Sequence, residues 1–176
     1  MNRARALGIA FLLVGSGLLS GCGLQPLYSG GQSGAVASSL SSISVGPIPE
    51  RAGWLVRNAL VDRLGGESAN PLYRLEVELD DDITGFGIRG DIGATRERRT
   101  LRARYRLVNI ATGGVVLDAT AGSDAGIDVV SSEYATIAAE QSALERLSAV
   151  IADQMVARLA LYASRRSRAQ PIPTRR

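Results

Sequence analysis

Alternation of apolar and polar residues with a period of two marks three long stretches of this chain. Residues 71–82, 95–110 and 115–128 place apolar side chains on one side and polar side chains on the other. This pattern predicts strands with one buried and one wet face. A shorter alternation at residues 42–48 predicts a first strand, which two prolines would end.

Helical spacing marks two other stretches. In residues 51–65 apolar residues recur every three or four positions, and Gly65-Gly66 would stop the helix. A second helix of about 30 residues begins after Ser131 or Ser132, either of which could cap it, and closes near Arg165. Its predicted buried stripe consists of Ile137, Leu144, Leu147, Ile151, Met155 and Tyr162.

These elements follow one another in the order strand, helix, three strands, helix. Strands that alternate bury only one face, so their sheet needs helices on one side only. We therefore expect an α+β fold, a two-layer sandwich of a mainly antiparallel four-stranded sheet with both helices on its apolar face. Residues 41–164 would form this single domain, and the polar face of the sheet would be left open.

The start of the chain has the pattern of a secretory signal. Arg3 and Arg5 precede a short apolar segment that ends in Leu19-Ser20-Gly21-Cys22. This ending resembles the lipobox of bacterial lipoproteins, so we expect residues 1–21 to be a signal peptide and Cys22 to carry fatty-acyl chains such as palmitate. The alternative is an ordinary signal peptide that happens to contain a cysteine. Cys22 favours the lipobox, because it is the only cysteine and stands where the apolar segment stops.

Segments of biased composition flank the predicted domain. Gly, Ser and Ala dominate residues 22–40, which predicts a flexible, lipidated tether. Residues 165–176 are rich in Arg and Pro and are predicted to be a disordered tail.

Charge limits the partners of the folded part. All 20 basic residues are arginine, and the formal net charge is +3. Seven of these arginines lie in the signal peptide or the tail, so 13 remain against 17 acidic residues, a net charge of −4. This balance disfavours nucleic acid as a partner.

One strand nevertheless carries a row of arginines on its polar face, namely Arg98, Arg102, Arg104 and Arg106. One interpretation is a solvated face on which these arginines pair with Glu76 and Glu78 of the neighbouring strand. The other is a surface for phosphate or carboxylate groups, which arginine binds through two parallel hydrogen bonds. The row is therefore a candidate binding site.

A glycine-rich segment separates two of the strands. Gly85-Phe86-Gly87-Ile88-Arg89-Gly90 matches the dinucleotide pattern G-x-G-x-x-G, but a strand follows where that motif needs a helix. We therefore expect a mobile hairpin loop, and Gly85, Phe86, Gly87, Ile88 and Arg89 are candidates for contact with a partner protein.

The sequence offers little for catalysis or metal binding. Adjacent strand residues point to opposite faces, so only Asp80 and Asp82 of Asp80-Asp81-Asp82 share a side, and we expect a solvated strand end. The chain has no histidine and no thiol other than Cys22. We therefore expect neither an enzyme nor a bound metal or cofactor.

Three segments resemble one known family, the LPS-assembly lipoproteins called LptE. Cys22-Gly23-Leu24-Gln25-Pro26-Leu27-Tyr28 is similar to the mature start of that family, which commonly reads Cys-Gly-Phe-x-Pro-Leu-Tyr, with Leu24 in place of the aromatic residue. The helical segment Arg57-Asn58-Ala59-Leu60-Val61-Asp62-Arg63-Leu64 resembles the first helix of the family. Residues 138–154, followed by Arg158-Leu159, resemble its last helix.

This resemblance implies a non-enzymatic part of the lipopolysaccharide export machinery. Members of the family are anchored in the inner leaflet of the outer membrane and face the periplasm. They plug the β-barrel LptD, help it assemble and take part in the transfer of lipopolysaccharide. An alternative is a lipoprotein adaptor of another envelope or secretion complex, which would bind a periplasmic protein and no lipid.

Overall fold

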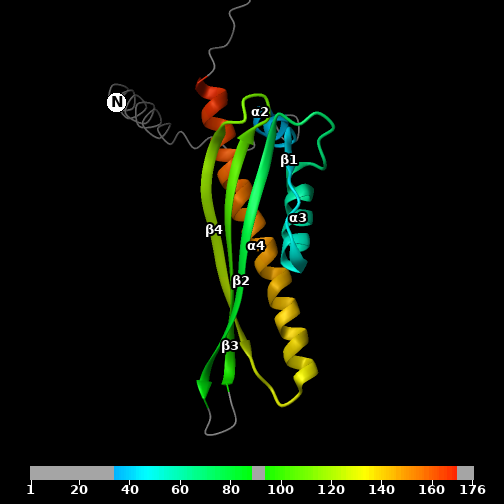
Figure 1. Cartoon of the computed structure of the whole chain (residues 1–176), viewed down its shortest axis with the longest axis vertical. Coiled ribbons are helices and arrows are strands. Elements are labelled where there is room, and N and C mark those ends of the chain that lie inside the picture. The colour runs from blue at the N-terminus through cyan, green and yellow to red at the C-terminus, as the bar shows by residue number, and fades with distance from the viewer. Residues whose placement is uncertain (1–33, 89–93, 170–176) are drawn as a thin grey trace, which may run out of the picture.

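The computed structural model describes residues 34–88 and 94–169 (Figure 1). The predicted order of strand, helix, three strands and helix is confirmed, and one short helix precedes it. None of the described helices combines the length and apolar composition needed to cross a membrane. The elements are α2 (Ala35–Leu40), β1 (Ile43–Val45), α3 (Glu50–Leu64), β2 (Tyr73–Ile88), β3 (Ala94–Asn109), β4 (Val115–Asp128) and α4 (Glu133–Ala169).

The four strands form one sheet in the order β1-β2-β3-β4. Strands β2, β3 and β4 pair antiparallel, with Leu75 opposite Leu107 and Leu107 opposite Leu117. The short β1 pairs parallel with β2, with Ile43 opposite Tyr73, because α3 carries the chain back across the sheet. The predicted α+β fold with a mainly antiparallel sheet is confirmed, and the sheet is mixed through β1 alone.

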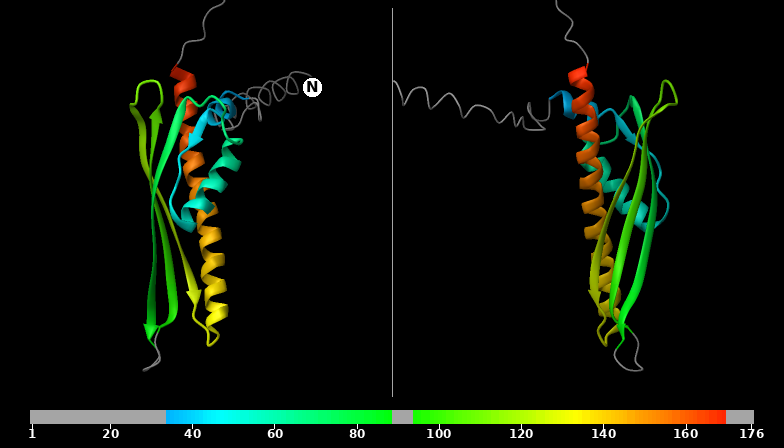
Figure 2. Two further views of the ribbon diagram at one scale, coloured as in Figure 1. Left: turned by 45° about the vertical axis from the view of Figure 1, so that its right-hand side comes forward. Right: turned by 90° about the vertical axis from the view of Figure 1, so that its left-hand side faces the viewer.

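Both long helices cover the same face of the sheet, so the molecule has two layers (Figure 2). The core between the layers comes from the alternating strand positions and the helical stripes that the sequence predicts. Burying such apolar side chains is the main force that stabilises the fold. The largest fully buried side chains are those of Tyr105, Leu60, Leu75, Leu101, Leu107, Ile151, Met155, Leu159 and Val56.

The C-terminal end of helix α3 is fixed by a glycine and by an ion pair. The helix ends at Leu64, and the φ of 96° at Gly65 is the left-handed conformation that glycine adopts most easily after a helix. Near this end the Arg63 guanidinium donates to the Asp153 carboxylate of α4 over 2.6 Å. This hydrogen bond lowers the pKa of the Asp153 carboxyl below its usual range and ties α3 to α4.

Helix α4 confirms most of its predicted stripe. Leu144, Leu147, Ile151 and Met155 are buried, while Tyr162 is half-buried. Ile137 was wrongly placed in the core, because it lies in the first turns of α4 and 43% of it is exposed. The helix runs on to Ala169, into the segment predicted as tail.

Two further segments are more ordered than composition suggests. Residues 35–40, assigned to the tether, form α2, whose Leu40 is buried in the core. Residues 85–88, predicted as part of a loop, belong to β2, because Gly85 and Phe86 pair with Glu97 and Arg96 of β3. Arg89, like the signal peptide and Cys22, lies outside the described residues.

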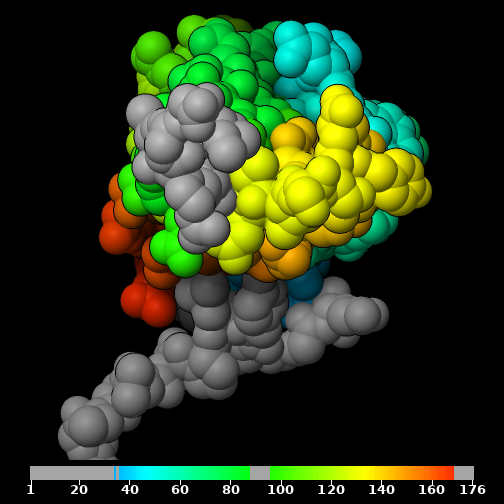
Figure 3. Space-filling model, turned by 90° about the horizontal axis from the view of Figure 1, so that it is seen from below, coloured from blue at the N-terminus to red at the C-terminus, as the bar shows by residue number. Residues whose placement is uncertain are grey.

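The molecule is elongated along α4 and has two distinct ends (Figure 1). At the upper end lie α2, the turn between β3 and β4, and the C-terminal turns of α4. At the lower end lie the far ends of β2 and β3 and the first turns of α4, which Figure 3 shows from below.

Candidate functional site: the outer face of the sheet

The outer face of the sheet is the one that no described helix covers (Figure 2). Even-numbered residues of β2, β3 and β4 point to this face, since their odd-numbered neighbours fill the core. Arg98, Arg102, Arg104 and Arg106 therefore lie in one row along the middle strand, as the alternation predicts. The acidic residues of the two flanking strands stand on either side of this row.

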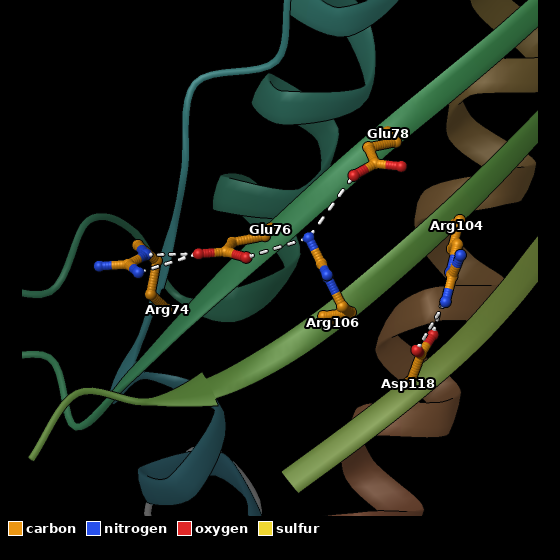
Figure 4. A network of polar contacts seen from close by, with 6 residues as sticks. All are labelled: Arg74, Glu76, Glu78, Arg104, Arg106 and Asp118. Carbon is orange, nitrogen blue, oxygen red and sulfur yellow. Dashed lines mark hydrogen bonds and ion pairs between the residues drawn. The ribbon is translucent and has the colours of Figure 1, made fainter. Parts of the chain in front are cut away.

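Three arginines of this face take part in the ion pairs drawn in Figure 4. Arg106 lies 3.6 Å from Glu76 and 3.5 Å from Glu78, and Glu76 also accepts from Arg74 over 2.9 Å. The predicted pairing with Glu76 and Glu78 is thus present for Arg106.

The third arginine of the network, Arg104, pairs with the other flanking strand. It donates to the Asp118 carboxylate of β4 over 3.0 Å. This hydrogen bond lowers the pKa of the Asp118 carboxyl.

Arg98 contacts an aromatic ring as well as a carboxylate. Its guanidinium lies 5.6 Å from the centre of the Phe86 ring, within the range of a cation–π contact, and 4.0 Å from Asp124. The next arginine along the strand, Arg96, pairs with Asp128 over 3.1 Å. Arg98 and its neighbour Arg96 are therefore also charge-paired.

Arg102 differs from the other arginines of the row. Within the described residues its guanidinium makes no ion pair and no hydrogen bond, although Asp80 stands opposite it in the register. Its side chain instead crosses Gly122, where a Cβ atom would come within 2.5 Å of Nη1 and 2.7 Å of Cδ. The absence of a side chain at position 122 therefore makes the space in which Arg102 lies.

An open hollow of about 670 Å³ adjoins Arg102 and extends to the edge of β4. Gln154 of α4 closes this edge, because its side-chain amide accepts from the Gly122 N–H over 3.2 Å and donates to the Gly122 carbonyl over 3.3 Å. Unpaired strand edges invite association with other chains. Gln154 therefore protects one point of the β4 edge.

As a whole, the outer face of the described strands is balanced in charge. Six arginines stand against seven carboxylates, which gives a net charge of −1. The arginines are Arg74, Arg96, Arg98, Arg102, Arg104 and Arg106, and the acids are Glu76, Glu78, Asp80, Asp82, Asp118, Asp124 and Asp128.

On the inner face, sequence reasoning missed an ion pair. Arg99 donates to both carboxylate oxygens of Asp81, over 2.8 and 2.6 Å, and its third contact is the Glu140 carbonyl of α4 at 3.1 Å. Only 13% of the Arg99 side chain and 17% of the Asp81 side chain are exposed. The signal was present in the sequence, since two opposite charges occupy odd-numbered, core-facing positions two places apart in the register.

The other motifs contribute no site to the described part of the chain. The first two glycines of the G-x-G-x-x-G match lie within strand β2, so they do not form the turn before a helix that a dinucleotide needs. No group of three or more possible metal ligands occurs in residues 34–88 and 94–169, which include the acidic run at residues 80–82.

Three solved structures with a similar fold are described as bacterial lipoproteins. A candidate lipoprotein of Caulobacter crescentus CB15 is 26% identical, has a TM-score of 0.62, and covers 74% of this chain and 98% of its own. Lipoprotein B of Nitrosomonas europaea is 12% identical, with a TM-score of 0.54 and coverage of 70% and 88%. The rare lipoprotein B of Shewanella oneidensis is 9% identical, with a TM-score of 0.52 and coverage of 71% and 96%. These last two share the fold alone.

The sequence of the domain identifies the family. Residues 40–159 match the LptE family, described as lipopolysaccharide-assembly. The match runs from the end of α2 through most of α4 and so covers nearly the whole sandwich. The chain therefore belongs to the LptE family. A comparison with curated proteins found no match.

Proposed function

We propose that this protein is a non-enzymatic lipoprotein of the outer membrane that plugs and helps assemble the β-barrel LptD. Lipid on Cys22 holds the protein in the inner leaflet of the outer membrane, facing the periplasm. The protein binds lipopolysaccharide while the lipopolysaccharide is inserted into the outer membrane. The observation that carries the proposal is the match of residues 40–159 to the lipopolysaccharide-assembly family. The run from Cys22 to Tyr28 supports it, because it combines a lipidation site with the family's characteristic start.

The outer face of the sheet suits a plug. The interior wall of a large transmembrane barrel is polar, so a protein inside it needs a polar surface without a strong net charge. The outer face offers paired arginines and carboxylates with a net charge of −1. An apolar face would find no apolar partner on that polar wall.

Lipopolysaccharide binding, in this proposal, uses the row Arg98, Arg102, Arg104 and Arg106. Arg102 is the arginine of this row best placed to bind a phosphate, because within the described residues it forms no ion pair that would have to break first. The others would have to exchange a carboxylate for a phosphate, which reduces their net gain. The segment from Gly85 to Arg89 remains a proposed contact with the barrel.

A pull-down from detergent-solubilised membranes tests the partner. Lipidated protein with a C-terminal tag should retain LptD in stoichiometric amount. Retention of a different periplasmic protein, without LptD, would favour an adaptor of another envelope complex instead.

The lipid ligand needs a separate measurement. A charge-assisted hydrogen bond contributes about 1.5–3 kcal/mol, so Arg102→Glu should weaken binding of purified lipopolysaccharide by roughly tenfold or more. The matched control is Arg96→Glu on the same strand and face, whose side chain pairs with Asp128. Equal affinities of both variants and the parent in the same salt would exclude the row as the binding site.

A further inference from the structure

The upper end of the molecule is basic, whereas the lower end is acidic. Four segments gather at the upper end, residues 34–45, 64–73, 107–117 and 158–169, and they contain four arginines and one glutamate. That glutamate, Glu67, already pairs with Arg57 of α3. The segments of the lower end, residues 80–88, 94–102 and 122–145, contain nine acids and four arginines.

The arginines of the upper end lie at the end of α4. Arg165, Arg166 and Arg168 are all exposed, and no acidic residue follows Asp153 along the helix. Arg166 donates to the Tyr73 hydroxyl and stacks on its ring, but none of the three forms an ion pair within the described residues. Two further arginines follow in the sequence at positions 175 and 176.

Exposed apolar side chains accompany these arginines. Leu72 is 63% exposed, Ile110 45% and Val115 53%. They lie together, because the Ile110 N–H donates to the Leu72 carbonyl and Val115 pairs with Val108 at the turn between β3 and β4. Apolar side chains beside a cluster of cations are typical of surfaces that settle into the headgroup region of a membrane.

A hollow of about 340 Å³ opens at the same end, between α2, the start of β2 and α4. Ile43, Leu72, Tyr162 and Ala163 give it an apolar lining, and Arg166 stands among the residues around it. This arrangement of an apolar hollow beside a cation matches the two parts of an anionic phospholipid.

The chain reaches the sandwich at this end. The first described residue, Gly34, lies only 12 positions after Cys22, so even a fully extended connection spans about 40 Å. Helix α4, with 37 residues, is about 55 Å long. A lipid on Cys22 would therefore hold the upper end close to the bilayer and leave the lower end as the far end.

We propose that the upper end docks on anionic phospholipid headgroups of the membrane that holds the Cys22 lipid. Arg165, Arg166 and Arg168 contact the phosphates, while Leu72, Ile110 and Val115 enter the headgroup region. This docking concerns the lipidated protein that has not entered the barrel. This inference rests on the lipid attachment proposed above but not on LptD or lipopolysaccharide.

The test uses lipidated protein reconstituted with vesicles of phosphatidylcholine, with or without phosphatidylglycerol. Leu72→Cys carries an environment-sensitive fluorophore, since lipid blocks Cys22 and no other cysteine exists. Its emission should shift to the blue only with phosphatidylglycerol, and high salt should reverse the shift. A fluorophore on Tyr134→Cys, 84% exposed at the lower end, should show no shift.

Substitutions of the arginines supply the decisive comparison. Each basic residue near an anionic surface contributes about 1 kcal/mol, so Arg165→Gln with Arg168→Gln should lower the docking equilibrium roughly 30-fold. Arg146→Gln, on the same helix but farther from this end, should leave it unchanged. Equal emission in both kinds of vesicle, or a shift that survives the double substitution, would overturn the docking proposal.

Flotation of the same samples separates this proposal from the lipid anchor. Protein held by lipid floats with phosphatidylcholine vesicles whether or not its upper end docks. Protein without a functional anchor that still docks floats only with vesicles that contain phosphatidylglycerol. Loss of flotation with phosphatidylcholine therefore contradicts the anchor and leaves the docking result to stand on the emission shift.

Discussion

The sandwich has two halves that are covered differently, and the difference shows where its stability lies. In the two-helix half, both α3 and α4 cover the sheet, and Leu60, Leu75 and Tyr105 are at most 1% exposed. In the one-helix half, which is the lower part of the sheet, α4 alone covers the sheet (Figure 1). There the inner face includes an ion pair and the half-buried Glu97, and Ile83 and Ile137 are 40% and 43% exposed.

One helix is too narrow to bury a three-stranded sheet, which explains this difference. Apolar residues at uncovered inner positions would remain in contact with water and contribute little to stability. Charged residues at those positions can pair with one another while they keep some contact with solvent. The two-helix half therefore stabilises the fold, and the one-helix half extends it towards the lower end.

The largest effect is expected in the two-helix half. Leu147 is 3% exposed and belongs to the main core cluster, so Leu147→Asp would bury an unpaired charge. It should cost several kcal/mol, a large part of a total stability of roughly 5–15 kcal/mol. Thermal melts would show unfolding at or near room temperature. Val150→Asp, on the same helix but 41% exposed, should melt close to the parent. Similar melts for both variants would contradict the burial of Leu147.

The same contrast explains how far the sequence could predict the fold. In the two-helix half, alternation at Tyr73, Leu75 and Val77 and helical spacing at Leu147 and Ile151 agree with the burial observed. Periodicity reports which residues face the core only where something covers that face. Ile137 fits the helical spacing but lies where α4 has no neighbour beyond the strands, so the pattern overestimated its burial.

The candidate site could be predicted only in part. Alternation placed the four arginines on the outer face, but it could not show that Arg104 pairs with Asp118 of β4 while Arg102 forms no ion pair within the described residues. Register between strands decides such pairing, and a single sequence does not fix it. Composition also could not reveal α2, since its segment is rich in Gly and Ser, yet Leu40 at the end of this helix is buried in the core.

A smaller effect is expected for the ion pair of the one-helix half. Arg99→Met removes the partner of Asp81, whose side chain is only 17% exposed. Breaking a fully buried pair costs roughly 3–5 kcal/mol, and partial exposure of this pair reduces the expected loss to about 2 kcal/mol. Urea denaturation would measure it.

Two controls sharpen this measurement. Arg104→Met breaks the exposed pair with Asp118 and should leave the midpoint within error. Asp81→Leu together with Arg99→Met should recover much of the loss, because no unpaired charge then remains. A midpoint for Arg99→Met equal to that of Arg104→Met would mean that the two halves do not differ in this respect.

The smallest effect concerns Glu97, and it should appear only as the pH rises. Burial, followed by repulsion from the Glu140 carboxylate of α4, raises the pKa of the Glu97 carboxyl, and its Oε2 is buried without a hydrogen-bond partner in the described structure. The folded protein therefore holds this proton more tightly than the unfolded chain does. The free energy of unfolding must then fall as the pH rises from the ordinary glutamate range through the raised pKa.

Glu97→Gln removes that fall, so the variant should melt slightly higher than the parent at neutral pH and no higher below the ordinary glutamate pKa. Glu78→Gln on the outer face, where 72% of the side chain is exposed, is the matched control and should melt close to the parent. Parallel melting curves for Glu97→Gln and the parent across this range would show that the one-helix half tolerates a charged Glu97 as easily as the outer face tolerates Glu78.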